Sequence, residues 1–236
     1  MSSGTGNGPA KDKGRVLIKV IIVILICAIA VVGKMIWDQM NDEKGTSGMK
    51  ADFHELAEMN PEVVAWLTVD DTMIDTVICQ AEDNTKYLNT DVYGEQTLTG
   101  CPFLDYRNDP KLVDRYSIIY GHNVENRLMF SDILLFQDGE FWDKERTGTI
   151  ELVDGTIYKI RFFACVKAKE DDSSYFDPRM VRNNWEEDFL EGLTEGAEVS
   201  KDRIELSDRI LVLSTCEEAD SEDRVLVLGK LSETGE

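Results

Sequence analysis

Apolar residues near the start of the chain form one long stretch. Residues 16–36 read VLIKVIIVILICAIAVVGKMI, and the only charges in this stretch are Lys19 and Lys34, close to its two ends. A helix rises about 1.5 Å per residue, so the stretch spans about 30 Å, the thickness of a bilayer core. The pattern predicts a single transmembrane helix over residues 16–37.

Charged residues on either side of this helix predict its orientation. Basic residues precede it and acidic residues follow it: Lys11, Lys13 and Arg15, then Asp38, Asp42 and Glu43. The positive-inside bias places residues 1–15 in the cytoplasm as a short tail and the rest of the chain outside the cell. A cleaved signal peptide is the alternative, because residues 28–30 read Ala-Ile-Ala. The apolar stretch continues past that site, which favours an uncleaved signal anchor.

Beyond a polar linker at residues 38–50, the pattern changes to short apolar runs separated by turn residues. Such runs predict β-strands, and two of them form a hairpin around Asp154-Gly155. The predicted strands cover residues 73–78, 102–104, 116–120, 149–153, 156–167, 209–215 and 224–231. Many short strands with few helices indicate a mainly β domain over residues 51–236, built as a closed or nearly closed barrel.

Helical patterns are few in this domain. Residues 53–58 are predicted to be helical, and residues 61–66 suit a second short helix with proline at its first position. The apolar segment 128–136 is also predicted to be helical. In the long connection 170–208 one amphipathic helix is expected, because apolar residues recur every four positions at Trp185, Phe189 and Leu193.

The cysteines give no sign of a metal site. Cys27 lies in the predicted membrane helix. The cysteines of the domain are far apart in the sequence and form no C-x-x-C pair: Cys79, Cys101, Cys165 and Cys216. Strict alternation along strand 156–167 places Cys165 on the face that carries lysine and arginine, as a structural residue. We expect no metal and no organic cofactor.

Composition narrows the classes of function. The formal net charge of −21 argues against a nucleic-acid partner, because phosphate binding needs clustered cations. His54-Glu55 opens a pattern similar to H-E-x-x-H, but Glu58 stands where the second histidine is needed. This substitution excludes a zinc protease of that type.

Three chemically active side chains are predicted at strand edges. Cys216 ends one predicted strand, His122 follows another, and Arg224 opens a third. A thiol, an imidazole and a guanidinium supply a nucleophile, an acid–base group and a cation for a developing oxyanion. The only other histidine, His54, lies in the predicted N-terminal helix. We therefore expect Cys216, His122 and Arg224 to be the catalytic residues.

The segments that hold these residues resemble those of a known family. Leu213-Ser214-Thr215-Cys216 is similar to the L-x-T-C signature of sortases, and Gly121-His122-Asn123 is similar to the histidine segment of class B sortases. Arg224 stands at the usual offset of the family arginine from the cysteine. The resemblance extends over essentially all of residues 51–236, with further similar segments at 60–66, 83–88 and 103–108.

The resemblance implies a fold and an activity. The fold is a closed eight-stranded β-barrel with N-terminal helices and a helical insert at residues 170–208, preceded by the transmembrane helix. The activity is that of a cell-surface transpeptidase of Gram-positive bacteria. Such enzymes cleave a C-terminal sorting signal, of the NP-x-T-x kind in class B, after threonine through a thioacyl intermediate. They then join the new acyl group to an amine of the cell wall.

Partners and binding residues follow from the same resemblance. The partners are surface proteins that bear a sorting signal, a peptidoglycan precursor or cross-bridge amine, and the membrane through the N-terminal helix. By similarity, four residues line the groove for the sorting signal: Asn84, Leu88, Ser214 and Glu217.

The same residues are also compatible with three other classes of protein. A papain-like or NlpC-type cell-wall peptidase also uses cysteine and histidine, but its cysteine usually comes first in the chain and precedes a helix. An L,D-transpeptidase has its histidine shortly before the cysteine, whereas here His122 precedes Cys216 by far more. A non-catalytic surface-binding barrel is the non-enzyme alternative. Convergence of the three side chains in one groove distinguishes the enzyme from that barrel.

Overall fold

A computed structural model describes residues 53–124, 128–144, 146–216 and 221–234 of the chain. The predicted cytoplasmic tail (1–15), transmembrane anchor (16–37) and linker (38–50) lie outside these ranges, as does Glu217. Within them, no helix is both long enough and apolar enough to cross a membrane.

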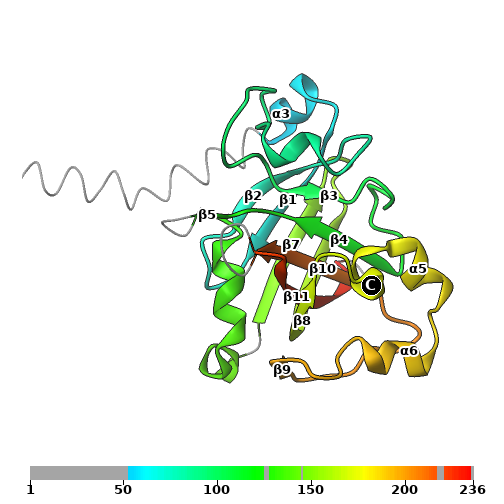
Figure 1. Ribbon diagram of the computed structural model, residues 1–236. Coiled ribbons are helices and arrows are strands. Elements are labelled where there is room, and N and C mark those ends of the chain that lie inside the picture. Colours follow the sequence, from blue (N-terminus) through cyan, green and yellow to red (C-terminus); the bar gives the residue numbers. More distant parts are fainter. Residues whose placement is uncertain (1–52, 125–127, 145, 217–220, 235–236) are drawn as a thin grey trace, which may run out of the picture. The chain divides into compact units, whose positions relative to one another are not determined.

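Eight strands hydrogen-bond in a closed ring (Figure 1). Their order around the ring is β11–β10–β4–β3–β2–β1–β7–β8, and β8 pairs with β11 to close it. Their bounds are β1 Val63–Val69, β2 Asp75–Cys79, β3 Phe103–Leu104, β4 Tyr116–Tyr120, β7 Arg146–Leu152, β8 Ile157–Lys169, β10 Ile210–Cys216 and β11 Asp223–Glu233. The prediction of a mainly β, closed eight-stranded barrel is confirmed.

Among the described residues, three short strands lie outside the ring. β9 (Val199–Ser200) pairs with β8 at Cys165 and Ala164, beyond the part of β8 that pairs with β7. β5 (Asn123–Val124) and β6 (Leu128–Met129) form a separate two-stranded ribbon directly after β4. The ribbon leads into the 3-10 helix η2 (Ser131–Gln137), which confirms a helical segment there but over a shorter range than 128–136.

The strand faces divide the core into an inner and an outer part. Leu211 and Leu213 of β10 belong to the cluster inside the barrel, together with Val225 and Val227 of β11. The alternate residues of the same strands belong to a second cluster on the outer face: Ile210, Val212, Leu226 and Leu228. Both faces of these strands are therefore buried, which explains their continuous apolar sequence.

The alternation of β8 is interrupted, which changes the position of Cys165. Ala164 pairs with Leu228 and Phe162 pairs with Gly229, so Phe163 is an extra residue on β8, a β-bulge. Phe162 and Cys165 therefore both belong to the barrel interior, while Phe163 and Ala164 belong to the outer cluster. The expectation that Cys165 shares the charged face is wrong, because a bulge shifts the side-chain alternation by one residue.

The N-terminal part of the domain holds one of the two predicted helices. The helix α3 (Phe53–Met59) is confirmed. Residues 61–66 are not helical, since β1 starts at Val63 and pairs with β2 and with β7. β-Branched residues at Val63 and Val64 favour a strand, and two neighbouring strands outweigh the helix-start signal of Pro61.

The insert between β8 and β10 covers the outer cluster. It contains three short helices, α4 (Ser173–Phe176), α5 (Pro178–Asn183) and α6 (Glu187–Gly192). Figure 1 shows α5 and α6 together on one side of the barrel. A helical insert is confirmed, but the single amphipathic helix is wrong, because α6 begins only after Trp185 and ends before Leu193. Those two side chains still pack on the outer cluster.

Candidate active site

Strand register places the three predicted catalytic residues at one end of the barrel. Cys216 is the last residue of β10 and pairs directly with Arg224 of β11. β4 runs parallel to β10, and Tyr120 is the partner of Ser214. His122 follows Tyr120 by two residues, just as Cys216 follows Ser214, so His122 leaves the sheet at the same edge. The backbone of Cys216 is described, whereas its side chain is not.

A groove opens at this end of the strands. Its cavity volume is about 760 Å³, and both His122 and Arg224 line it. Three of the four residues predicted to bind the sorting signal also line it, namely Asn84, Leu88 and Ser214; Glu217 lies outside the described residues. The remaining lining residues are Leu98, Cys101, Phe103, Arg107, Tyr120, Gly121, Asn123, Glu170, Phe176, Thr215, Ser221 and Glu222.

His122 is held at the wall of the groove by its neighbours. Its Nε2 lies 2.7 Å from the carbonyl oxygen of Leu88. A carbonyl oxygen can only accept a hydrogen bond, so Nε2 carries the proton in this arrangement. The backbone is fixed as well, because the N–H of Gly121 donates to the Ser214 carbonyl at 3.1 Å and the hydroxyl of Thr215 donates to the Gly121 carbonyl at 2.8 Å. These bonds tie the loop of His122 to the end of β10.

Arg224 is already paired in the groove. Its Nη2 donates to Oε2 of Glu170, and its Nη1 donates to the carbonyl oxygen of Ser221. The Arg224 side chain is 21% exposed and that of Glu170 is 50% exposed. The guanidinium therefore lies partly buried at the edge of the groove, with a carboxylate within reach of water as its counter-ion.

A buried carboxylate, Asp105, connects the walls of the groove. Asp105 is 0% exposed and accepts hydrogen bonds from Asn84 at 2.8 Å, from the Tyr120 hydroxyl at 3.0 Å, and from Nη2 of Arg107 at 2.6 Å. Arg107 also donates to the carbonyl of Phe176 at 2.6 Å, which reaches the insert. Burial opposes ionisation of Asp105, yet the hydrogen bonds from Arg107 and Asn84 outweigh it and hold the pKa below its usual range.

This network was not predicted as part of the site. The family resemblance includes residues 103–108 (FLDYRN) only as a similar segment. A single acidic residue in a loop gives no sequence pattern that predicts a role in the site. Its role depends on long-range contacts. Asp105 bonds to residues 15 and 21 positions away, and Arg107 bonds to Phe176, 69 positions away.

The side-chain hydroxyl of Ser214 is buried and unpaired within the described part of the chain. It is 1% exposed, and its hydroxyl has no hydrogen-bond partner among the described residues. It lies two positions before Cys216 and lines the groove. An unpaired hydroxyl on a residue that lines a groove is a donor and acceptor that a bound peptide backbone can satisfy.

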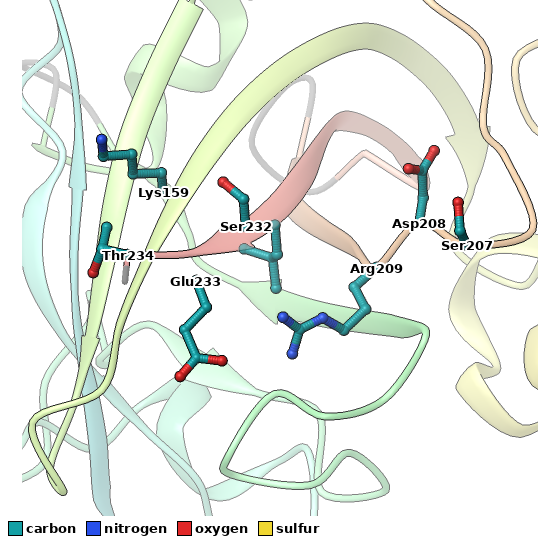
Figure 2. Close-up of a pocket in the computed structure, with 8 residues that line it drawn as sticks. Lys159, Ser207, Asp208, Arg209, Ser232, Glu233 and Thr234 are labelled. Atoms are coloured by element: carbon teal, nitrogen blue, oxygen red, sulfur yellow. The ribbon is translucent and has the colours of Figure 1, made fainter. Parts of the chain in front are cut away.

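Two other places are less suited to this chemistry. His54 is exposed on α3, with its ring 5.0 Å from that of Phe53, and does not line the groove. A second hollow has a volume of about 580 Å³, and its lining residues include Lys159, Arg209 and Glu233, which Figure 2 shows. It lies at the opposite end of β10 from Cys216, and its lining residues include neither cysteine nor histidine.

Comparison with known proteins places the chain in a family. No protein-family model matches the sequence. Sortase B of Listeria monocytogenes is 34% identical over 187 residues, which are 78% of this chain and 75% of the relative. Sortase B of Staphylococcus aureus is 28% identical over 201 residues, 82% of this chain and 80% of the relative.

Comparison with solved structures indicates the same family. The crystal structure of Spy0129, a Streptococcus pyogenes class B sortase involved in pilus biogenesis, superposes with a TM-score of 0.72 at 34% identity. It covers 80% of this chain and 100% of that one. The sequence and the barrel thus point to the same family, and the chain belongs to the class B sortases, which are cysteine transpeptidases.

Proposed function

We propose that Cys216, His122 and Arg224 carry out the transpeptidation, and that the groove beside them binds a C-terminal sorting signal. The observation that supports this most is the register of β4, β10 and β11, which brings the three residues to one edge of the sheet. His122 and Arg224 also line the same cavity.

In the first half-reaction the Cys216 thiolate attacks the threonine carbonyl carbon of the signal. An S–C bond forms, and the carbonyl oxygen becomes an oxyanion. Arg224 donates hydrogen bonds to that oxygen, and donors of this type contribute about 3–4 kcal/mol to the transition state. His122, protonated at the start, gives its proton to the leaving amine as the C–N bond breaks. The product is a thioacyl enzyme.

In the second half-reaction an amine of the cell wall attacks the thioacyl carbon. His122, now neutral, accepts a proton from the attacking nitrogen, and the thiolate of Cys216 leaves. The original charges of both groups are then restored. The Leu88 carbonyl orients the imidazole during both steps, because it holds one ring nitrogen at 2.7 Å.

The substrate is a signal of the NP-x-T-x kind on a surface protein. Asn84, Leu88 and Ser214 line the groove, and the Leu88 carbonyl contacts His122. The unpaired Ser214 hydroxyl offers a hydrogen bond to the backbone of the peptide. Glu217 completes this set in the proposal, directly after the nucleophile in the sequence.

The domain acts outside the cell, tethered by residues 16–37. A tether confines the enzyme and its substrate to one membrane surface and so raises their effective concentration. Deleting residues 1–37 leaves peptide cleavage in solution unchanged and abolishes surface anchoring of the substrate in cells. A mature native protein whose N-terminus begins after Ala30 would show a cleaved signal peptide instead.

The direct test is a panel of fluorogenic peptides that carry NP-x-T-x and related signals. The enzyme is incubated with each peptide, with and without a peptidoglycan-derived amine, and the products are identified by mass spectrometry. We expect cleavage after threonine and, with the amine present, a transpeptidation product in place of the free acid. Cleavage at other positions, or hydrolysis that no amine redirects, would support a cell-wall cysteine peptidase instead.

A further inference from the structure

Two cysteines that are far apart in the sequence lie side by side in the structure. The sulfur atoms of Cys79 and Cys101 are 3.6 Å apart, and both residues are buried. Cys79 ends β2, and its N–H donates to the carbonyl of Pro102 at 3.0 Å, so the two backbone segments are held together beside the thiols.

The chain between these cysteines forms a wall of the active-site groove. Residues 80–100 contain Asn84, Leu88 and Leu98, which line the cavity, and Cys101 lines it as well. The N–H of Cys101 donates to the Tyr87 carbonyl at 3.0 Å, and the next carbonyl, that of Leu88, contacts His122. The thiol pair thus lies at the base of the loop that holds the imidazole.

We propose that Cys79 and Cys101 are a redox modification site, where a reversible disulfide closes the groove-wall loop. The oxidant is a low-molecular-weight disulfide, which reaches Cys101 through the cavity. The sulfur of Cys101 attacks one sulfur of that molecule, and its S–S bond breaks. The first thiol leaves and takes up the proton of Cys101.

A second exchange completes the protein disulfide. Cys79 attacks the Cys101 sulfur of the mixed disulfide and releases the second small thiol, which takes up the proton of Cys79. The two protein thiols are oxidised, and one small disulfide is reduced to two thiols. The two sulfur atoms need to approach from 3.6 Å to about 2.05 Å, a shift that side-chain rotation can supply in part.

The local environment keeps the pair reduced until such an oxidant arrives. The hydrogen bond with Cys79, together with burial, raises the pKa of the Cys101 thiol well above its usual value. Thiolate is the reactive form, so both chance oxidation and the exchange with a small disulfide are slow at neutral pH, and the crosslink should form faster as the pH rises. Outside the cell, where disulfides persist, a completed crosslink is stable.

Cys165 provides an internal control. It is as buried as Cys79, but it lies in the barrel interior and has no hydrogen bond to another thiol within the described part of the chain. Burial raises its pKa to about 12. It shares the low reactivity of Cys101 without the neighbouring sulfur, so it should remain a free thiol under the same treatment.

The test is a disulfide map of the full-length protein after incubation with oxidised glutathione. Free thiols are blocked with an alkylating agent under denaturing conditions, and the protein is digested with trypsin. Trypsin cuts after Lys86, which separates the Cys79 peptide (51–86) from the Cys101 peptide (87–107). We expect one crosslinked species of these two peptides, lost on treatment with dithiothreitol, while the Cys165 peptide stays alkylated.

Cysteine variants and thermal unfolding test the assignment of the crosslink to Cys79 and Cys101. Cys79→Ala and Cys101→Ala each abolish the crosslink, and Cys165→Ala leaves it unchanged. The oxidised wild type should melt about 5–10 °C higher than the reduced form, since the crosslink restricts the unfolded loop.

Three outcomes would overturn the proposal. They are two free thiols at Cys79 and Cys101 after treatment, a mixed glutathione disulfide at Cys101 that never resolves, and a crosslink of either cysteine to Cys165. These outcomes are read from the wild type, independently of catalytic activity.

Discussion

The guanidinium of Arg224 forms an ion pair with the carboxylate of Glu170 at the edge of the groove. Glu170 comes directly after β8, which pairs with β11 beside Arg224. The carboxylate therefore takes up an Nη2 donor of the guanidinium that the proposed mechanism directs at the substrate carbonyl. Since Glu170 is half-exposed, the pair resembles surface ion pairs, which contribute about 0–1 kcal/mol to stability, and a substrate can displace it at low cost.

Arg224 and Glu170 should respond very differently to conservative substitution. Arg224→Lys lowers kcat/KM by about two decades or more, nearly as much as Arg224→Ala, because an ammonium cannot reproduce the planar fork of donors. Glu170→Gln changes kcat/KM by less than about tenfold, because the neutral amide still accepts one hydrogen bond. Peptide-cleavage kinetics of the three variants check this. Full activity of Arg224→Lys would mean that only a diffuse charge is needed.

Cys216→Ala should abolish peptide cleavage without loss of the fold. The substitution removes the sulfur that forms the thioacyl bond, while the backbone pairing with Arg224 needs no particular side chain. Circular dichroism and activity are measured on the same preparation. Cys165→Ala is the control and keeps its activity, since Cys165 lies in the barrel interior. Equal loss in both variants would contradict the assignment of the nucleophile.

Asp105→Asn should destabilise the domain by about 3 kcal/mol at neutral pH, since it leaves the largely buried cation of Arg107 with only its 3.5 Å contact to the carboxylate of Asp177. It should also raise KM for peptides, because an amide has one acceptor oxygen where the carboxylate has two, so its NH2 group faces donors that include Asn84 or Arg107. The pKa of Asp105 is lowered by folding, so its stabilisation is present above the ordinary carboxyl value of 3.8 and is lost as pH falls through the folded value below that.

Urea unfolding of wild type and Asp105→Asn at several pH values checks the sign. The difference between their free energies of unfolding should be largest at neutral pH and should shrink in strong acid. Asp154→Asn is a matched control at an exposed hairpin turn, where the pKa is also lowered, by hydrogen bonds from Thr156. A difference that stays constant down to strong acid would show that the charge of Asp105 is not what stabilises the groove.

Gly121→Ala should disturb the position of His122. A Cβ at Gly121 would lie 2.5 Å from Cγ of Phe130, whose ring is fully buried, so the loop or the ring has to move. We expect a loss of about 1–3 kcal/mol in stability from overpacking and a fall in kcat of about tenfold. Gly139→Ala, where a Cβ meets no atom within 4 Å, is the control. Unchanged kcat in Gly121→Ala would show that the loop tolerates the shift.

The sequence predicted the central strands well. Residues 116–120 were predicted as a strand and form β4, and 209–215 and 224–231 correspond to β10 and β11 with shifts of at most two residues. These strands are buried on both faces, so their apolar runs are continuous. The strands that bring His122 and Arg224 into one groove are therefore among the elements that the sequence pattern predicts best.

Two of the wrong predictions share a physical cause. The strand at Val63 and the position of Cys165 depend on partners far away in the chain: β7 pairs with β1, and a bulge opposite Gly229 shifts β8. The Asp105 network and the Cys79–Cys101 pair likewise join loops that only the closed barrel brings together. Local patterns report propensity and periodicity, and they contain no information on such contacts.

The parallel pairing of β4 with β10 has a consequence for how the enzyme matures. Tyr120 and Ser214 are neighbours in the sheet although they lie 94 positions apart, and β10 and β11 come last in chain order among the strands of the ring. Contacts of such large sequence separation form late and slowly in folding. A chain still being synthesised has His122 but no partner strand beside it. The proposed active site therefore forms only when β10 and β11 complete the ring, and a chain that lacks these strands should not form a thioacyl intermediate with a peptide.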